Sequence, residues 1–246
     1  MDNGIWSTWY DLAEGARADH HAWLHGTYLP GLLQHPGIAW AAHYQHVGGG
    51  EAMQALGERL PRGPGAEMGT GTQFVILVGA ASPHVFFRAG SPIYEANQDA
   101  ETRERLAERE GARPCIFVEE ERVTGPEYGQ CDPGGTTGPA IQTGSFRVAT
   151  AEDEIDLGGW YAQYRLPHMA QMPGAMRTRK LSCVAGWATH SVLYEFTSLE
   201  ARMKNFEEPH EALALQEGEW TSRVVNYTIH APGSPTVGQR LWPPVE

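Results

Sequence analysis

The chain contains the stretch Trp23-Leu24-His25-Gly26-Thr27-Tyr28-Leu29-Pro30-Gly31-Leu32-Leu33-Gln34-His35-Pro36-Gly37. A second stretch has the same pattern and reads Trp160-Tyr161-Ala162-Gln163-Tyr164-Arg165-Leu166-Pro167-His168-Met169-Ala170-Gln171-Met172-Pro173-Gly174. The Trp, Leu-Pro and Pro-Gly positions keep one offset without a gap, since 160 − 23, 167 − 30 and 173 − 36 all equal 137. A unit of this length is too long for a solenoid repeat. The pattern therefore predicts two copies of one small domain.

Secondary-structure signals around these stretches predict the order β-α-β-β-α-β in each copy. In the first copy we expect strands at residues 5–11, 38–47, 72–81 and 114–123, and helices beginning at Asp19 and covering 94–110. In the second copy we expect strands at 145–150, 175–184, 188–197 and 220–230, and helices at 152–172 and 199–215. The first copy alone carries a Gly- and Pro-rich insertion, 48–71, with a short helix at 52–60. Gly26 and Pro30 predict a kink near residues 28–30 of the first helix.

The order β-α-β-β-α-β is the ferredoxin-like arrangement, in which two helices cover one face of a sheet. The uncovered faces of two such sheets can pack on each other and close into a barrel, which also protects the strand edges. We therefore predict an α+β fold in which two ferredoxin-like units, packed sheet to sheet, form one pseudo-twofold α+β barrel. The expected divisions are a first unit at 1–124, a Gly- and Pro-rich linker at 125–144, and a second unit at 145–246 that ends in a Pro-rich tail.

The composition narrows the classes of function. The 246 residues include 30 acidic and 18 basic ones, for a formal net charge of −12, whereas nucleic-acid binding needs clustered Lys and Arg. No apolar run approaches the ~20 residues that cross a bilayer, and no signal peptide is visible at the N-terminus. Cys115, Cys131 and Cys183 are few and far apart, which is typical of reduced thiols in a cytosolic protein. We expect a cytoplasmic protein without nucleic-acid or membrane partners.

The repeated pattern resembles the EthD-like branch of the dimeric α+β barrel superfamily. Both copies carry it, as Trp…Leu-Pro…Pro-Gly at residues 23–37 and 160–174, and residues 192–201 resemble the third strand and second helix start of that family. The resemblance implies a barrel, which relatives usually build from two chains and which this tandem repeat would build within one. A homodimer of whole chains stays open. Where the family commonly has His before Leu-Pro, this chain has Tyr28 and Arg165, so activities that depend on that His do not carry over.

Large and small residues alternate along residues 38–47, and this alternation assigns the two faces of the second strand. Small residues pack best beneath helices, so we expect the Ala39, Ala41 and His43 face there and the opposite face toward the barrel lumen. The residues predicted to face the lumen are Trp40, Tyr44 and His46, with Arg177 and Arg179 from the second copy. Aromatic walls with arginine suit an aromatic or enolic anion, and a histidine can move a proton near neutral pH. In the alternative interpretation, both arginines form salt bridges at the surface and His46 caps the rim of the barrel.

These residues give the candidate site. The catalytic candidates are His46, His43 and Tyr28, and the candidates for substrate contact are Trp40, Tyr44, Arg177, Arg179 and Tyr194. His21 and His25 are one helical turn apart, but no zincin-type Glu follows His21, so we predict no metal site. The sequence also lacks a P-loop, a dinucleotide fingerprint and a nucleophile elbow. We expect no cofactor.

Members of the superfamily include cofactor-free decarboxylases, dehydratases, cyclases, isomerases and monooxygenases as well as haem enzymes, and the fold alone does not choose among them. The leading hypothesis is a cofactor-independent lyase or isomerase, of the decarboxylase, dehydratase or cyclase type. It would act on a small aromatic or polyketide-like acid in the barrel lumen by His general acid–base chemistry. The alternatives are a haem-dependent or cofactor-free monooxygenase on the same fold, and a non-catalytic protein that binds a small ligand.

Overall fold

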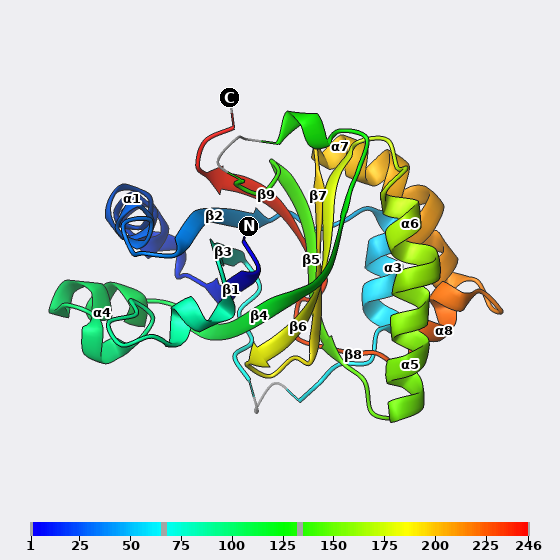
Figure 1. The fold of residues 1–246 in the computed structure, drawn as a ribbon, viewed down its shortest axis with the longest axis horizontal. Helices are drawn as coiled ribbons and strands as arrows, with labels where there is room; N and C mark the ends of the chain where they lie inside the picture. The colour runs from blue at the N-terminus through cyan, green and yellow to red at the C-terminus, as the bar shows by residue number, and fades with distance from the viewer. Residues whose placement is uncertain (1, 65–67, 132–134, 246) are drawn as a thin grey trace.

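The computed structural model describes residues 2–64, 68–131 and 135–245. Eight antiparallel strands in these residues close into a barrel at the centre of the molecule (Figure 1). Their order around the barrel is β4 (Glu110–Thr124), β1 (Gly4–Asp11), β3 (Phe74–Ala80), β2 (Ile38–His46), β9 (Thr236–Trp242), β5 (Ala140–Arg147), β7 (His190–Phe196) and β6 (Ala175–Ala185), which pairs back with β4. A two-residue strand, β8 (Ile229–His230), pairs with the end of β5.

The barrel consists of two four-stranded sheets with the same internal order. The first sheet runs β4-β1-β3-β2, and the second runs β9-β5-β7-β6, so corresponding strands take corresponding places. The sheets join at two seams, where β4 pairs with β6 and β2 pairs with β9. The predicted α+β fold, two ferredoxin-like units that pack sheet to sheet as one barrel, is confirmed.

Helices cover the outside of both sheets. Those on the first sheet are α1 (Arg17–Trp23), the π-helical segment η2 (Leu24–Tyr28), α2 (Leu29–Leu32) and α4 (Ala100–Ala107). Those on the second are α5 (Ala151–Trp160), the π-helical segment η7 (Tyr161–Arg165), α6 (Leu166–Met169), α7 (Leu199–Arg202), the π-helical segment η8 (Met203–Glu211) and α8 (Trp220–Tyr227). Short 3₁₀ turns occur at Glu14–Ala16, Pro83–Phe87, Glu95–Asn97, Tyr128–Gln130 and Ala212–Leu215. No helix in the described part of the chain is long and apolar enough to span a membrane.

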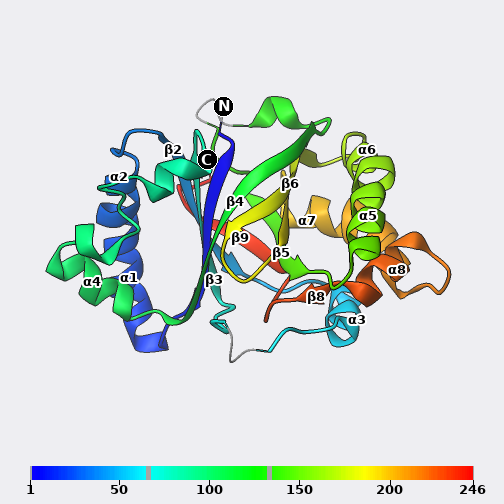
Figure 2. The ribbon, with the colours of Figure 1, turned by 60° about the horizontal axis from the view of Figure 1, so that its bottom comes forward.

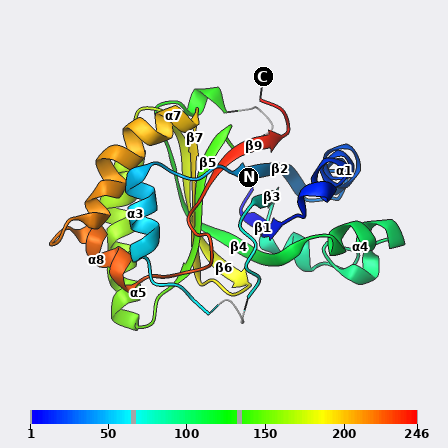
Figure 3. The same cartoon turned by 180° about the vertical axis from the view of Figure 1, so that it is seen from behind.

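One helix lies on the sheet of the other unit. Figures 2 and 3 show α3 (Glu51–Arg59), from the insertion in the first unit, among the helices of the second sheet. Met53, Leu56 and Leu60 form a buried cluster there with Ala214 and Val237. The insertion therefore ties the first unit to the second.

The largest difference from the sequence analysis concerns the last strand of the second unit. Residues 220–230, expected to form a strand, contain the helix α8 and only two strand residues. Their β-branched residues are typical of strands, but Thr221, Val224 and Thr228 are buried at the three- and four-residue spacing of one helix face. The last barrel strand is instead β9, in the segment expected to be a tail.

Two boundaries also differ. The strand expected at 145–150 is β5, which already begins at Ala140, inside the segment expected to be a linker. Residues 132–134 of that predicted linker lie outside the described residues. In place of a kink near residues 28–30, the helix widens into η2 directly before Leu29-Pro30. Proline has no N–H to donate, and a π turn accommodates the missing hydrogen bond.

Side chains from both units fill the inside of the barrel. Trp9, Trp40, Tyr44, Phe117 and Leu193 belong to one buried cluster there. An eight-stranded barrel has an interior just wide enough for side chains to fill. Two further buried clusters lie outside the barrel, one between each sheet and its own helices. Each of these outer interfaces also has a cleft or pocket.

Candidate functional site

The two faces of β2 have different surroundings, and Ala39, expected beneath the helices, is exposed. Trp40 and Tyr44 belong to the buried cluster inside the barrel. Ala41 belongs to the cluster beneath the helices of the first unit, and His43 shares that face. Tyr194 lies on the outer face of the second sheet, in the cluster beneath the second unit's helices. The structure therefore separates Tyr194 from the lumen residues.

The two arginines inside the barrel have carboxylate partners. Arg177 donates to both oxygens of Glu195, from Nε at 2.7 Å and from Nη2 at 2.9 Å. Arg179 Nη1 donates to Asp2 Oδ2 at 2.7 Å, and its Nε lies 3.4 Å from Glu195 Oε1. These pairs neutralise the two guanidinium groups inside the barrel, whereas the alternative interpretation of the sequence placed the salt bridges at the surface.

His46 lies apart from these arginines. Its Nδ1 is 3.1 Å from the carbonyl oxygen of Val237 and 3.2 Å from the amide nitrogen of Val237, at the end of β2. Its side chain is half-buried. The structure does not bring His46 together with Arg177 and Arg179.

A chain of hydrogen bonds runs across the outer face of the first sheet. Tyr10 Oη lies 2.9 Å from His43 Nε2, and His43 Nδ1 lies 2.8 Å from His25 Nε2. Tyr10 and His43 are fully buried, whereas His25, from η2, is half-buried. We call these three residues the His43 chain. Burial lowers the pKa of His43 well below its ordinary value and also lowers the pKa of His25, so both imidazoles are neutral at pH 7.

A cleft of about 470 Å³ lies on the same face of the first sheet. Its lining includes Trp6 and Thr8 from β1, Tyr28 from η2, Tyr94, Leu106 and Arg109. We call it the Arg109 cleft. The guanidinium carbon of Arg109 lies 4.7 Å from the ring centre of Tyr10 and 5.7 Å from that of Tyr28. Arg109 therefore joins the cleft to the His43 chain.

Three polar atoms at this cleft have no partner in the described residues. Arg109 Nε, Arg109 Nη2 and Tyr28 Oη are buried and make no hydrogen bond there. A buried guanidinium without a carboxylate is costly, because burial disfavours an uncompensated charge. Burial raises the pKa of Tyr28 above its ordinary value, so this hydroxyl remains a donor. A guanidinium and a phenol that face an aromatic cleft suit the oxyanion of an aromatic ligand.

The described part of this cleft lacks the side chains that most often hold a haem group. Haem iron is generally held by a histidine or a cysteine thiolate, among a few other side chains. No histidine lines the described part of this cleft, and the thiol of Cys115 is buried and hydrogen-bonded to Cys183. Within residues 2–64, 68–131 and 135–245, we also find no group of three or more His, Cys, Asp or Glu side chains that could hold a metal ion.

Comparison with known proteins identifies the type of fold but not the reaction. Neither a family profile nor a curated protein sequence matches the chain. A protein from Fusobacterium nucleatum subsp. nucleatum, provisionally assigned as a monooxygenase, has a TM-score of 0.60 at 6% identity, over 98% of this chain and 93% of that chain. An anthrone oxidase-like protein has a TM-score of 0.54 at 12% identity, with 98% and 91% covered. A provisionally assigned chlorite dismutase has a TM-score of 0.54 at 13% identity, with 98% and 96% covered. At these identities the likeness shows the dimeric α+β barrel fold alone.

The sequence analysis included Tyr28 and His43 among its candidates but missed Arg109. Arg109 lies near the end of a charged run at 101–110, where solvated side chains are the ordinary expectation. Only the packing of Tyr10 and Tyr28 around it shows that its charge is unpartnered. Tyr28 did carry a signal, since it takes the place of the family's usual His before Leu-Pro.

Proposed function

We propose that the protein is a cofactor-independent monooxygenase that oxidises a small aromatic phenol or enol in the Arg109 cleft. One observation carries the proposal: Nε and Nη2 of Arg109 and the hydroxyl oxygen of Tyr28 are buried without a hydrogen-bond partner in the described residues, and both residues line one aromatic cleft. The two groups can donate to a single oxyanion. Aromatic side chains, including Trp6 and Tyr94, supply the surface against which an aromatic ring packs.

Ionisation of the substrate is the step that these residues assist. A guanidinium beside a phenol or enol favours the charged form and so lowers the pKa of the substrate. The resulting anion is electron-rich and is itself the reductant for dioxygen. In the balanced reaction, a ring CH₂ group and one O₂ yield a carbonyl group and one water molecule. Two hydrogens leave the carbon, one oxygen atom replaces them, and the other oxygen atom leaves as water.

The histidines take a positioning role in this proposal. His43 and His46 do not line the cleft, so neither contacts a substrate bound there. His43 instead holds the hydroxyl of Tyr10, and the ring of Tyr10 supports the guanidinium of Arg109. Trp40, Tyr44, Arg177 and Arg179 belong to the barrel core, where they support the sheet beneath the cleft.

A lyase or isomerase reaction is the second candidate. It would begin from the same anion, because Arg109 and Tyr28 stabilise an enolate whether or not dioxygen follows. The structures of similar fold that are provisionally assigned as a monooxygenase or described as anthrone oxidase-like lead us to put the oxygenase first.

Oxygen consumption tests the proposal directly. We expect the purified protein to consume O₂ with anthrone or a related enolisable aromatic compound and to form the carbonyl product with one oxygen atom from ¹⁸O₂. Arg109→Met should lower kcat/KM by about 10²-fold, the usual effect of removing one charge-stabilising donor. Tyr28→Phe keeps the ring and should lower kcat/KM by about tenfold.

Arg88→Met is the matched control, because Arg88 is an exposed arginine of the same unit and should leave kcat/KM unchanged. Conversion without O₂ uptake would replace the oxygenase by the lyase or isomerase. Tight binding without turnover would identify a carrier protein. A Soret band in the purified protein would contradict the cofactor-independent reaction.

A further inference from the structure

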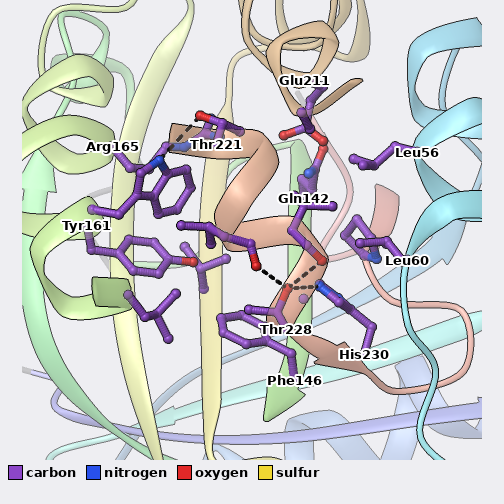
Figure 4. Close-up of a pocket in the computed structure, with 18 of the residues that line it drawn as sticks. Leu56, Leu60, Gln142, Phe146, Tyr161, Arg165, Glu211, Thr221, Thr228 and His230 are labelled. Atoms are coloured by element: carbon purple, nitrogen blue, oxygen red, sulfur yellow. Dashed lines mark hydrogen bonds between the residues drawn. The ribbon is translucent and has the colours of Figure 1, made fainter. Parts of the chain in front are cut away.

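A second pocket lies at the corresponding interface of the second unit, between its sheet and its helices (Figure 4). The sheet contributes Gln142, Phe146 and Tyr194, and the helical segments contribute Arg165 and Glu211. Leu56 and Leu60 close the pocket from the insertion of the first unit. We call it the Arg165 pocket. Its volume of about 70 Å³ is far smaller than that of the Arg109 cleft.

Arg165 is the reason to expect a ligand here. It is 3% exposed and lines the pocket, and its Nε and Nη1 atoms are buried without a hydrogen-bond partner in the described residues. Its guanidinium carbon lies 4.6 Å from the ring centre of Trp160 and 5.0 Å from that of Phe206. Aromatic rings offer a cation some compensation, but they leave its hydrogen-bond donors unused. A buried guanidinium in this state calls for an anion.

Glu211 acts on Arg165 through its charge but accepts no hydrogen bond from Nε or Nη1 of Arg165. Figure 4 shows Glu211 and Arg165 as separate parts of the pocket wall, and no ion pair joins them in the described residues. Glu211 is 6% exposed and hydrogen-bonds Gln142, whose Oε1 accepts from Arg202 Nε at 2.9 Å. Because Arg202 occupies the amide oxygen, Gln142 presents its NH₂ group to Glu211. Burial raises the pKa of Glu211 above its ordinary value, while the guanidinium groups of Arg165 and Arg202 act in the opposite direction.

The remaining wall is apolar and limits the size of a ligand. Leu56, Leu60, Phe146, Val192 and Val224 face the pocket. A volume of about 70 Å³ corresponds to about five water molecules, at about one probe sphere each. This space suits an anionic head of two oxygens with a short hydrocarbon tail.

We propose that the Arg165 pocket binds a short-chain monocarboxylate. The carboxylate accepts hydrogen bonds from Nε and Nη1 of Arg165. The tail contacts the leucines of the insertion and the valines of the second unit. The site is separate from the Arg109 cleft and does not depend on the reaction proposed there.

Calorimetric titration of the intact chain with butyrate tests the site. We expect 1:1 binding of butyrate and at least about tenfold weaker binding of butyramide, which has the same shape without the charge. Arg165→Met should weaken butyrate binding by at least about tenfold, because methionine keeps an unbranched stem and loses the guanidinium. Arg223→Met is the control, since Arg223 is on α8 but is exposed and pairs with Asp156.

The titration is repeated with Arg109→Met, which removes the other unpartnered guanidinium. Butyrate should still bind 1:1 to this variant, and loss of binding would assign the ligand to the first unit and overturn the proposal. Equal binding of butyrate and butyramide, or no butyrate binding at millimolar concentration, would also overturn it. The comparison of the two compounds uses the wild-type protein, so it decides the question even if Arg165→Met does not fold.

Discussion

Four arginines with buried guanidinium atoms differ in what neutralises their charge. Arg177 and Arg179 lie inside the barrel and form ion pairs with Glu195 and Asp2, although Nε and Nη2 of Arg179 make no hydrogen bond in the described residues. Arg109 and Arg165 lie outside the barrel against aromatic rings, with donor atoms that have no partner in the described residues. Strand alternation could predict that Arg177 and Arg179 point inward. It could not predict their partners, because Asp2 and Glu195 come from distant parts of the sequence.

The pH dependence of folding provides a test at one residue. Burial keeps His43 neutral in the native state, whereas the unfolded chain takes up this proton below about pH 6.5. The stability is therefore fully present above that pH and falls as the pH drops below it. Each such histidine contributes about 1.4 kcal/mol per pH unit to the slope. We expect His43→Gln to reduce the slope of the unfolding free energy between about pH 4.5 and 6 by up to this amount.

Urea denaturation across this pH range measures the slope. At pH 7, His43→Gln should also lose about 1–3 kcal/mol, since two hydrogen bonds of the His43 chain are disrupted. His84→Gln is the matched control, because His84 is exposed and its substitution should leave the slope as in the wild type. If the unfolding free energies of His43→Gln and of the wild type changed with pH by the same slope, His43 would not be held neutral by burial.

Among the elements, the π-helical segments η2 and η7 have the closest link to the sites. They occupy equivalent places, since Leu24 and Tyr161 differ by 137 residues, and so do their last residues, Tyr28 and Arg165. Tyr28 lines the Arg109 cleft and Arg165 lines the Arg165 pocket. A π turn carries one residue more than an α turn and often occurs at functional sites. It gives the last residue of each segment an orientation that a regular helix would not give.

Deletion of one residue from each segment tests this relation. Removing the exposed Thr27 should return η2 to α-helical pitch and turn Tyr28 away from the Arg109 cleft. We expect at least about a tenfold loss of ligand affinity in that cleft, with helical content retained in circular dichroism. Removing the exposed Gln163 should instead weaken the binding of butyrate in the Arg165 pocket. Each deletion is the control for the other, and equal effects of both at both sites would indicate general damage to the fold.

The local sequence pattern predicted most helices and strands. It failed where features typical of a strand and of a helix occurred in the same residues. The Trp…Leu-Pro…Pro-Gly pattern predicted the helix and the strand after it in both units, at η7 and β6 as at η2 and β2. Residues 220–227 contain both β-branched residues and a helical spacing, and the packing of α8 against α5 decided for the helix. Strand β9 follows several prolines and pairs with both β2 and β5. Only that pairing identifies it as a strand.

In the whole molecule, the barrel closes only because the sheets of the two units pair with each other. Two strand pairs join the sheets, β4 with β6 and β2 with β9. The salt bridge from Asp2 to Arg179 crosses between the units inside the barrel. On the outside, Met53 N donates to Glu207 Oε1 at 3.0 Å, and Arg59 donates to the carbonyl oxygen of Ala214 at 2.9 Å. The sequence repeat predicted that the sheets face each other, but the insertion gave no sign that it would cross to the second unit.

Separate production of the units tests this dependence. A fragment of residues 1–130 alone would expose the edges of β2 and β4 together with the apolar face around Trp9, Trp40 and Phe117. Exposed edges and apolar faces lead to aggregation, so we expect neither this fragment nor residues 137–246 to be a stable monomer with a cooperative thermal transition. Produced together, the fragments should associate 1:1 and recover the circular dichroism spectrum of the intact chain. The intact protein cut at a protease site inserted after Gln130 is the control, and it should remain one particle in size-exclusion chromatography. Two soluble fragments that each unfold cooperatively would show that the barrel is formed by two independent domains, because each sheet would then be stable without the other.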